Sequence, residues 1–205
     1  MSEQQPVKKR SRITLVLLIG VFVAPILLAY IVHKNKSLQP ESKSTGTVIS
    51  PARPLPEFSL KTQSGSEFQT KDIRGKWSFV YVLKGVCDEN CKLTLLKTRN
   101  AKLAQGAEGT RVNYYLLSAQ EIKDQALLEE FEKEHPKMII LFGSETELEK
   151  IFNTFKDDKG KSVTDAQRVY LLDPAANYMM FFETGFNPLG IMEDLKLLLK
   201  ASQIG

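Results

Sequence analysis

The chain has 205 residues, of which 42% are hydrophobic and 25% are charged, and its formal net charge is +4. This is the size of one ordinary domain with an additional segment. Six of the 28 basic residues but one of the 24 acidic residues lie in residues 1–36, so the rest of the chain is close to neutral. Its basic and acidic residues are interspersed, which argues against a nucleic-acid-binding surface, and we expect no nucleic-acid partner.

The first predicted element is a membrane anchor over residues 13–32. These twenty residues, ITLVLLIGVFVAPILLAYIV, carry no charge. As a helix they cover a hydrocarbon core of roughly 30 Å. A cleaved signal peptide has a shorter apolar region and ends in small residues, so the length favours an uncleaved anchor. The basic residues concentrate in residues 1–12, which places this N-terminus in the cytoplasm. We therefore expect a single-pass inner-membrane protein whose C-terminal domain lies in the periplasm.

A flexible tether over residues 33–53 is predicted to follow the anchor. The stretch SLQPESKSTGTVISPARPLP is rich in Ser, Thr and Pro and poor in bulky apolar residues. A segment of this composition cannot form a core of its own. The folded domain is then expected over residues 54–205.

The first half of the domain contains two strands and a helix after an entrance hairpin. In the hairpin, PEFSL and SEFQT flank the turn KTQSG. Residues 75–83, GKWSFVYVL, form a nearly continuous apolar run, as in a central strand buried on both faces. A helix is predicted over residues 90–105 and a strand over 111–118. The residues expected on the apolar face of that helix are Leu93, Leu96, Leu103 and Ala104.

The second half continues with alternating helices and strands. Residues 119–137 are predicted as a helix that Pro136 stops, 138–142 as a strand, and 145–155 as a helix. Ser144 and Glu147 form a capping-box pattern at the start of the latter helix. RVYLLD and YMMFFE are predicted as an antiparallel hairpin joined across PAAN.

The last helix is predicted to start with Asn187 as N-cap and Pro188 in its first turn. The residues expected on its buried side are Leu189, Met192, Leu195, Leu198 and Leu199. The order of the elements is βαβ, then α, then ββα. This order predicts an α/β domain with a mixed central sheet flanked by helices, and the thiol pair directly after the central strand matches a thioredoxin-like fold.

Cys87 and Cys91, in LKGVCDENCK, are the two cysteines of the chain. Their spacing is one residue longer than the C-x-x-C of thiol–disulfide oxidoreductases, and two thiolates alone do not complete a zinc site. If a helix begins at Cys87, both thiols lie on one face, at a separation that allows a disulfide or a shared Cu(I) ion. We expect exposed thiols that the helix N-terminus activates. The alternatives are a redox pair, a copper-binding pair and an inert structural disulfide.

With LPEFSL ahead and VYLLDP behind, the stretch GKWSFVYVLKGVCDENCK resembles the Sco/SenC family of cytochrome c oxidase assembly proteins. The resemblance covers about Pro54 to Leu199 and implies a membrane-anchored, thioredoxin-like domain. It also implies that Cys87 and Cys91, with a distant histidine, bind copper destined for the binuclear copper centre of the oxidase. This chain has Asp165 at the position of that histidine. It also has Lys92 where the family generally has proline, and LSAQE where the family has an acidic loop.

Other metal donors in the sequence have simpler explanations. A carboxylate such as that of Asp165 is a hard donor, poorly suited to Cu(I). His33 fits an interfacial residue at the end of the apolar run, and His135 fits a helix end, where a cation suits the dipole. At least one of Met179 and Met180 is expected in the core, and thioether ligation of copper is the alternative.

The leading functional hypothesis is an assembly factor for cytochrome c oxidase rather than a turnover enzyme. Its partners would be an oxidase subunit or other assembly factors. Its cysteines would relay copper to the subunit that holds the copper site, or reduce the cysteines of that subunit. The alternatives are a general periplasmic thiol–disulfide reductase and a scaffold with an inert cysteine pair. The cysteine spacing and the lack of a proline just before RVYLLD disfavour the general reductase. The sequence contains no common hydrolase, nucleotide-binding or zinc-protease motif.

Overall fold

The computed structural model describes residues 10–34, 44–83, 85–156, 163–164 and 166–202. The chain divides into two units, Met1–Lys43 and Ser44–Gly205. The first unit contains helix α1, Arg10–Lys34, with Pro25 inside it. Within the described part of the chain, no helix combines the length and the hydropathy that a membrane span requires. The anchor over residues 13–32 and its orientation therefore stay predictions.

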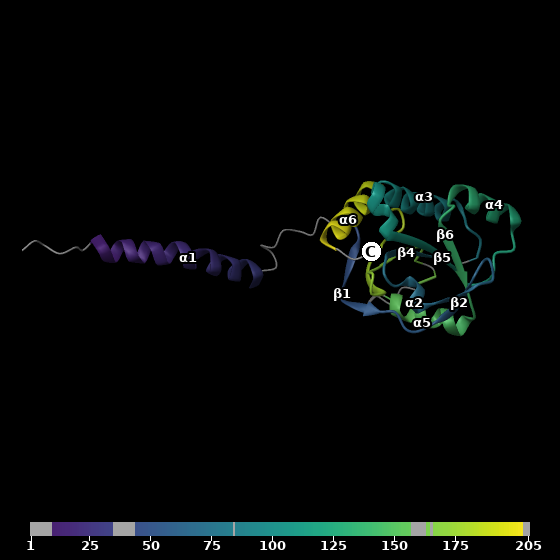
Figure 1. The fold of residues 1–205 in the computed structure, drawn as a ribbon, viewed down its shortest axis with the longest axis horizontal. Coiled ribbons are helices and arrows are strands. Elements are labelled where there is room, and N and C mark those ends of the chain that lie inside the picture. Colours follow the sequence, from purple (N-terminus) through teal and green to yellow (C-terminus); the bar gives the residue numbers. More distant parts are fainter. Residues whose placement is uncertain (1–9, 35–43, 84, 157–162, 165, 203–205) are drawn as a thin grey trace, which may run out of the picture. The chain divides into compact units, whose positions relative to one another are not determined.

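The second unit is built on one sheet, in which the described strands have the order β1-β8-β7-β4-β5-β6-β2-β3 (Figure 1). The strands are β1 (Thr47–Pro54), β2 (Ser59–Thr62), β3 (Glu67–Gln69), β4 (Trp77–Leu83), β5 (Val112–Ser118), β6 (Met138–Phe142), β7 (Val169–Leu172) and β8 (Asn177–Phe182). Strand β5 is parallel to β4 and to β6, whereas β7 is antiparallel to both β4 and β8. The predicted mixed sheet is confirmed, as are the hairpins β2–β3 and β7–β8.

Helices cover both faces of this sheet. The helices are α2 (Thr70–Ile73), α3 (Glu89–Leu103), α4 (Gln125–Glu134), α5 (Glu145–Phe155) and α6 (Pro188–Ala201), with the 3-10 helix η2 (Gly106–Arg111) after α3. Helices α3, α4 and α6 lie on one face and α2 and α5 on the other (Figure 1). Two separate apolar clusters fill the two layers, so the sheet is buried between them.

Strand β4 joins the two cores because every one of its residues is buried. Side chains alternate across a strand, so Phe79 and Tyr81 enter the cluster beneath α3 while Val80 and Val82 enter the cluster beneath α5. A continuous apolar run is therefore required here, as predicted. The strand ends at Leu83, and the cysteine loop starts there.

Two helix starts predicted from the sequence are confirmed. The Ser144 hydroxyl accepts from the Glu147 amide at the start of α5, and the side-chain oxygen of Asn187 accepts from the Leu189 amide at the start of α6. The Glu147 carboxylate accepts from the backbone of Ser59 rather than closing the capping box. Helix α4 is shorter than predicted, because it begins after its own N-cap, Asp124.

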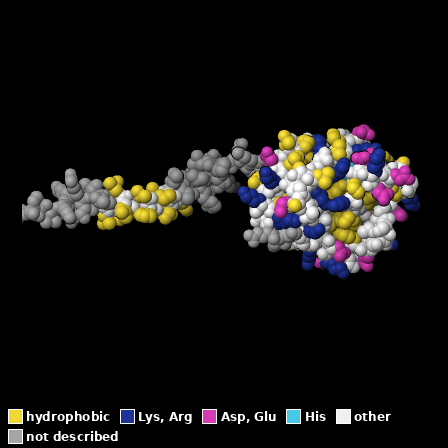
Figure 2. Space-filling model, turned by 45° about the horizontal axis from the view of Figure 1, so that its top comes forward, with side chains coloured by type: hydrophobic (Ala, Val, Ile, Leu, Met, Phe, Trp, Pro, Cys, Tyr) yellow, Lys and Arg dark blue, Asp and Glu magenta, His cyan; other side chains and the backbone are white. Residues whose placement is uncertain are grey.

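The buried face of α3 differs from the predicted one. Leu93, Leu96 and Leu103 are exposed, by 48%, 38% and 59%. The residues that α3 buries are Cys91, Thr94, Leu95, Thr98 and Ala101. Burial of Thr98 is possible because its hydroxyl donates to the Thr94 carbonyl at 2.8 Å. In Figure 2, apolar side chains accordingly lie among charged ones on the surface of the domain.

The apolar face of α6 was predicted in part. Leu195 and Leu199 are buried as expected, and Met192 and Leu198 are partly buried. Leu189 is 64% exposed, and Ile191 is buried instead. Gly190 lies against Thr45, where a Cβ atom would come within 1.8 Å of the Thr45 hydroxyl, so only glycine fits.

The domain begins earlier than predicted. Residues 47–53, assigned to the tether from their composition, belong to β1, which pairs with β8. The start of this segment is fastened by Asp194 of α6, whose carboxylate accepts from the Gly46 amide at 2.9 Å and from the Ser44 hydroxyl at 3.1 Å. The tether boundary at residue 53 is therefore wrong. Residues 35–43 of the predicted tether lie outside the described residues.

Candidate functional site

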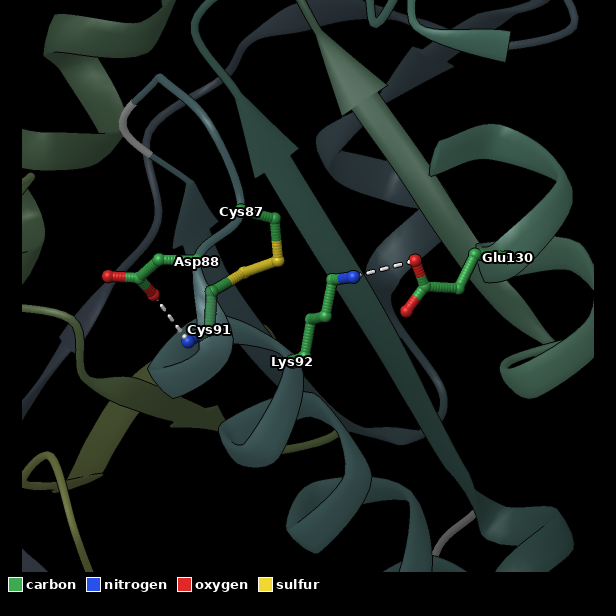
Figure 3. The surroundings of a disulfide bond; sticks show 5 residues. All are labelled: Cys87, Asp88, Cys91, Lys92 and Glu130. Carbon is green, nitrogen blue, oxygen red and sulfur yellow. Dashed lines mark hydrogen bonds and ion pairs between the residues drawn. A yellow bond between two sulfur atoms is a disulfide. The ribbon is translucent and has the colours of Figure 1, made fainter. Parts of the chain in front are cut away.

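Cys87 and Cys91 form a disulfide at the start of α3 (Figure 3). Their Cα atoms are 5.2 Å apart. The helix begins after its N-cap, Asp88, close to the predicted start at residue 90, so the condition that its first turn begins at Cys87 is not met. The Asp88 carboxylate accepts from the Cys91 amide at 2.8 Å, and the Asp88 carbonyl accepts from the Lys92 amide at 3.0 Å. Cys87 thus precedes the helix, and Cys91 lies in its first turn.

Asp88 was not singled out from the sequence. An aspartate three residues before Cys91, at the start of a helical pattern, is nevertheless the ordinary signal for an N-cap. The cap orders the loop between the two cysteines. Since the N-cap carboxylate fixes the Cys91 amide, it also fixes the backbone from which the second sulfur projects.

Both cysteines are buried, with 5% of Cys87 and 1% of Cys91 exposed. The expectation of exposed thiols is therefore wrong. The reason is that both belong to the apolar cluster beneath α3, next to Leu83 and Leu95. An attacking thiolate must reach a sulfur directly, so thiol exchange at this pair requires a local opening of the loop. Cys87 is the more exposed of the two and lies outside the helix.

Charged groups surround the pair on two sides. Lys92 reaches from α3 to Glu130 on α4, with 2.8 Å between ammonium and carboxylate (Figure 3). The hydrogen bond that the Lys92 ammonium donates to the Glu130 carboxylate raises the pKa of Lys92. On the other side, burial raises the pKa of Tyr81 to about 12, and the negative charge of Asp88 adds to this shift. Near neutral pH, Lys92 is therefore cationic and Tyr81 is neutral.

A hollow of about 280 Å³ lies at the C-terminal ends of β4 and β5, beside the cysteine loop. Val86, which precedes Cys87 and is 86% exposed, forms part of its wall. The opposite wall comes from residues 118–124, which include Ser118–Glu121 of the LSAQE stretch. Gly85 has φ +74°, a conformation that favours glycine and that turns the chain out of β4 toward this hollow. The hollow is large enough for one or two side chains of a bound peptide.

Asp165, at the position of the family's histidine, lies outside the described residues. The topology nevertheless places its neighbours. Strand β7 is antiparallel to β4, with Val169 opposite Tyr81, so the chain before Val169 reaches the edge of the sheet at which β4 ends. The Thr184 hydroxyl holds this segment by donating to the Ala166 carbonyl at 2.9 Å. The cysteines and the segment next to Asp165 therefore lie at the same end of the sheet.

The other predicted donors do not join the cysteines. His135 is 6% exposed, and its Nδ1 lies 3.1 Å from the hydroxyl of Tyr114, near the opposite end of the sheet. Burial, and then the nearby Arg99, lower the pKa of His135. Met180 is buried in the core, as expected of at least one methionine, and Met179 packs against the same cluster. The side chain of His33 lies outside the described residues.

The residues present fit a copper ion in part. Two cysteine sulfurs are soft donors suited to Cu(I), but they ligate as thiolates, so the disulfide must first be reduced. Among the described residues, no three or more His, Cys, Asp or Glu side chains are grouped as a metal site. The described part of the chain thus supplies two sulfur donors without a third ligand from these residue types.

Comparison with known proteins agrees with the fold. The family model for a transmembrane-like, thioredoxin-like, C-terminal domain matches residues 77–202. An SCO2-like protein of Rickettsia prowazekii is 27% identical over 151 residues, which cover 68% of this chain and 74% of that protein.

Solved structures show the same fold. The copper-bound crystal structure of Arabidopsis thaliana ScoI has a TM-score of 0.58 and 22% identity, over 72% of this chain and 98% of ScoI. BsSco, described as a member of the Sco family of cytochrome c oxidase assembly proteins with a disulfide switch, has a TM-score of 0.56 and 18% identity. That match covers 74% of this chain and 96% of BsSco.

Proposed function

This chain belongs to the Sco/SenC family of thioredoxin-like proteins, and we propose that it assists the assembly of cytochrome c oxidase by thiol–disulfide exchange at Cys87 and Cys91. The observation that carries the proposal is the disulfide that closes across the start of α3, directly after the central strand. A similar protein, BsSco, is described as an oxidase assembly protein with a disulfide switch, which supports the same role here.

In the proposed reaction, the reduced pair transfers two electrons to a disulfide of the oxidase subunit that will hold copper. The Cys87 thiolate attacks one client sulfur, forms a mixed disulfide and releases the other client sulfur as a thiolate. The Cys91 thiolate then attacks the Cys87 sulfur and releases the second client thiolate. The client gains two electrons and two protons, and the pair ends in the disulfide state. A dithiol reductant of the same compartment must then reduce the pair again.

Cys87 is assigned as the attacking residue for two reasons. It precedes the helix, and it is the more exposed cysteine, at 5% against 1%. The hollow beside Val86 gives the client a place next to Cys87. Cys91, fixed by the Asp88 cap, is well placed to resolve the mixed disulfide from inside.

The proposal includes a membrane anchor over residues 13–32 with the domain in the periplasm. It is supported by the charge-free run of that segment and by the family model, whose description is transmembrane-like. An anchored domain would stay near a membrane-bound oxidase. Protease protection of the domain in right-side-out and inverted membrane vesicles tests this arrangement. Cleavage of the domain only in inverted vesicles would refute the orientation.

A trapping experiment tests the thiol exchange. In cells, Cys91→Ser should accumulate a mixed disulfide between Cys87 and the copper-site subunit of the oxidase, because the resolving thiol is absent. Cys87→Ser is the matched control and should trap none. Oxidase activity and its copper content should fall in both variants and in the deletion strain. Unchanged oxidase in the double serine variant would refute the role and favour a scaffold.

Copper relay is the second candidate, because the similar Arabidopsis thaliana ScoI was solved with copper bound. The two sulfurs, once reduced, would provide soft ligands. An anaerobic Cu(I) titration of the reduced full chain, against a competing chelator, tests it. Loss of affinity in Cys87→Ser, together with a gain in Asp165→His, would support a copper site of the family type. No binding by the reduced chain would exclude the relay and leave thiol exchange.

A further inference from the structure

A second cavity, of about 390 Å³, lies at the end of α3 that is remote from the cysteines. Leu103, at the C-terminus of α3, and Gly106 and Thr110 of the following 3-10 helix line it. Helix α3 has 15 residues and rises about 1.5 Å per residue, so roughly 20 Å separates its two ends. The cavity is therefore distinct from the hollow beside Cys87.

Four basic side chains line this cavity. They are Lys76, Arg99, Lys102 and Lys137. None of the described residues that line it is an aspartate or a glutamate. Arg99 has a counter-charge in Glu134, 3.7 Å away, which does not line the cavity. The domain as a whole is close to neutral, so this is a local concentration of positive charge.

A helix-dipole effect explains part of this arrangement but not all of it. Basic residues near the C-terminus of a helix are favourable, which accounts for Arg99 and Lys102. Lys76 precedes β4 and Lys137 precedes β6, so neither belongs to α3. The fold therefore brings cations from three separate elements to one cavity.

Lys102 shows how closely these cations are held. It is half-buried, and its ammonium lies 5.7 Å from the centre of the Tyr114 ring. Burial, and then repulsion from Lys137 and Lys76, lower the pKa of Lys102. A bound anion would relieve this repulsion and supply the negative charge that the lining lacks.

The walls of the cavity limit the size of the ligand. Gly109 packs so closely that a Cβ atom there would lie 2.5 Å from the Lys102 carbonyl. Tyr114 is fixed through its hydroxyl, which lies 3.1 Å from His135 Nδ1. Leu103 and Pro136 add apolar surface. A compact anionic group attached to a small apolar portion fits these walls.

We propose that this cavity binds a phosphate group, either of a free phosphorylated small molecule or of an anionic lipid headgroup, through Lys76, Arg99, Lys102 and Lys137. Phosphate suits the set because guanidinium and ammonium groups give it strong, charge-assisted hydrogen bonds.

The test uses the full chain in a non-ionic detergent and isothermal titration calorimetry at constant ionic strength set with chloride. The probes are inorganic phosphate, glycerol phosphate and soluble dihexanoyl phosphatidylglycerol. We expect saturable binding of at least one probe. Binding of the lipid alone identifies a headgroup as the source, and binding of glycerol phosphate identifies a free ligand.

Lys102→Gln should weaken binding about tenfold or more, because one charge-assisted hydrogen bond is lost. Lys137→Gln should weaken binding to a similar extent, although Lys137 precedes β6 and does not belong to α3. The matched control is Lys196→Gln on the exposed side of α6, which makes the same charge change away from the cavity. The double variant Cys87→Ser, Cys91→Ser should bind the phosphate probes with unchanged affinity. A negative result for phosphate binding is therefore independent of the proposal that the cysteines exchange disulfides. No binding of any probe, or an equal loss in Lys196→Gln, would overturn the proposal.

Discussion

Reduction of the Cys87–Cys91 disulfide should lower the stability of the domain by only about 2 kcal/mol. The disulfide closes a loop of sequence separation 4. In the chain-entropy model, a loop of about five residues restrains the unfolded chain by about 2 kcal/mol at 25 °C. Both reduced thiols can stay in the core, since free cysteine behaves as a small apolar residue and these two are already buried.

The same free energy should appear in the redox potential. By thermodynamic linkage, a disulfide that stabilises the fold by about 2 kcal/mol is itself stabilised by that amount on folding. For a two-electron couple this lowers the reduction potential by about 40 mV relative to the unfolded chain. The two measurements are independent, so their agreement tests the reasoning.

The fluorescence of Trp77 is the natural signal, because it is the one tryptophan of the chain and is 5% exposed in the core. The melting temperature of the full chain in detergent should fall by about 4–8 °C on reduction, as expected for a domain of this size. The potential is measured in glutathione or dithiothreitol buffers with and without denaturant. If the domain unfolds on reduction, or if its free energy of unfolding falls by more than about 4 kcal/mol, the disulfide is a structural bond and not a reversible redox pair.

Three further predictions use the same fluorescence signal. Asp194→Ala should lower the free energy of unfolding by about 1–3 kcal/mol, because the buried amide of Gly46 loses its acceptor. An unchanged free energy of unfolding would place the start of the domain after this contact. Leu95→Ala should lower the free energy of unfolding by about 2–5 kcal/mol and Leu93→Ala by under about 1 kcal/mol. The reason is that Leu95 is 1% exposed and Leu93 is 48% exposed. A larger loss in Leu93→Ala would refute the assigned face of α3. His135 has a pKa lowered by burial from its ordinary 6.5, so the unfolded chain binds its proton first. Its contribution to the free energy of unfolding is therefore complete above about pH 6.5 and is lost as the pH falls toward the pKa of the folded state. In His135→Gln, the free energy of unfolding should depend less on pH in this range.

The strands of the central sheet could be predicted because their sequence leaves little choice. Both faces of β4 pack against an apolar layer, so its sequence is a continuous apolar run. The β7–β8 hairpin was predicted from the short connection between two such runs. The start of α6 was equally clear, since Asn187 and Pro188 are favoured at two adjacent helix positions.

The face of α3 could not be read from hydrophobicity alone. The leucines at 93, 96 and 103 have helical spacing, but so do the buried residues Leu95, Thr98 and Ala101. Threonine can be buried in a helix because its hydroxyl donates to the carbonyl one turn earlier, as Thr98 does to Thr94. Small residues and residues with a single hydroxyl allow α3 to approach the sheet. The leucines at 93, 96 and 103 remain on the solvent side of the helix.

Strand β1 was missed for a different reason. Its sequence, TVISPARP, has the composition of a linker, and most of its side chains are exposed. Its place in the sheet depends on backbone hydrogen bonds to β8 and on the Asp194 contact ahead of it, neither of which has a side-chain pattern. Edge strands of this kind carry little sequence signal, since pairing on one side requires no apolar face.

The topology and the side chains contribute separately to the candidate site. The cysteines follow the C-terminal end of β4, and the antiparallel β7 starts at the same end of the sheet, so this strand order brings the segment before β7 to the end at which the thiols lie. What that segment can do there depends on its residues. The family resemblance puts Asp165 at the position of a copper-binding histidine. There an imidazole, which suits copper, would be replaced by a hard carboxylate, which would weaken a Cu(I) site. Thiol–disulfide exchange needs the two sulfurs, an opening of the loop and a reductant, and none of these depends on residue 165. The same replacement should therefore impair copper relay and leave the redox reaction intact, so Asp165→His should change Cu(I) affinity without changing the reduction potential of the pair.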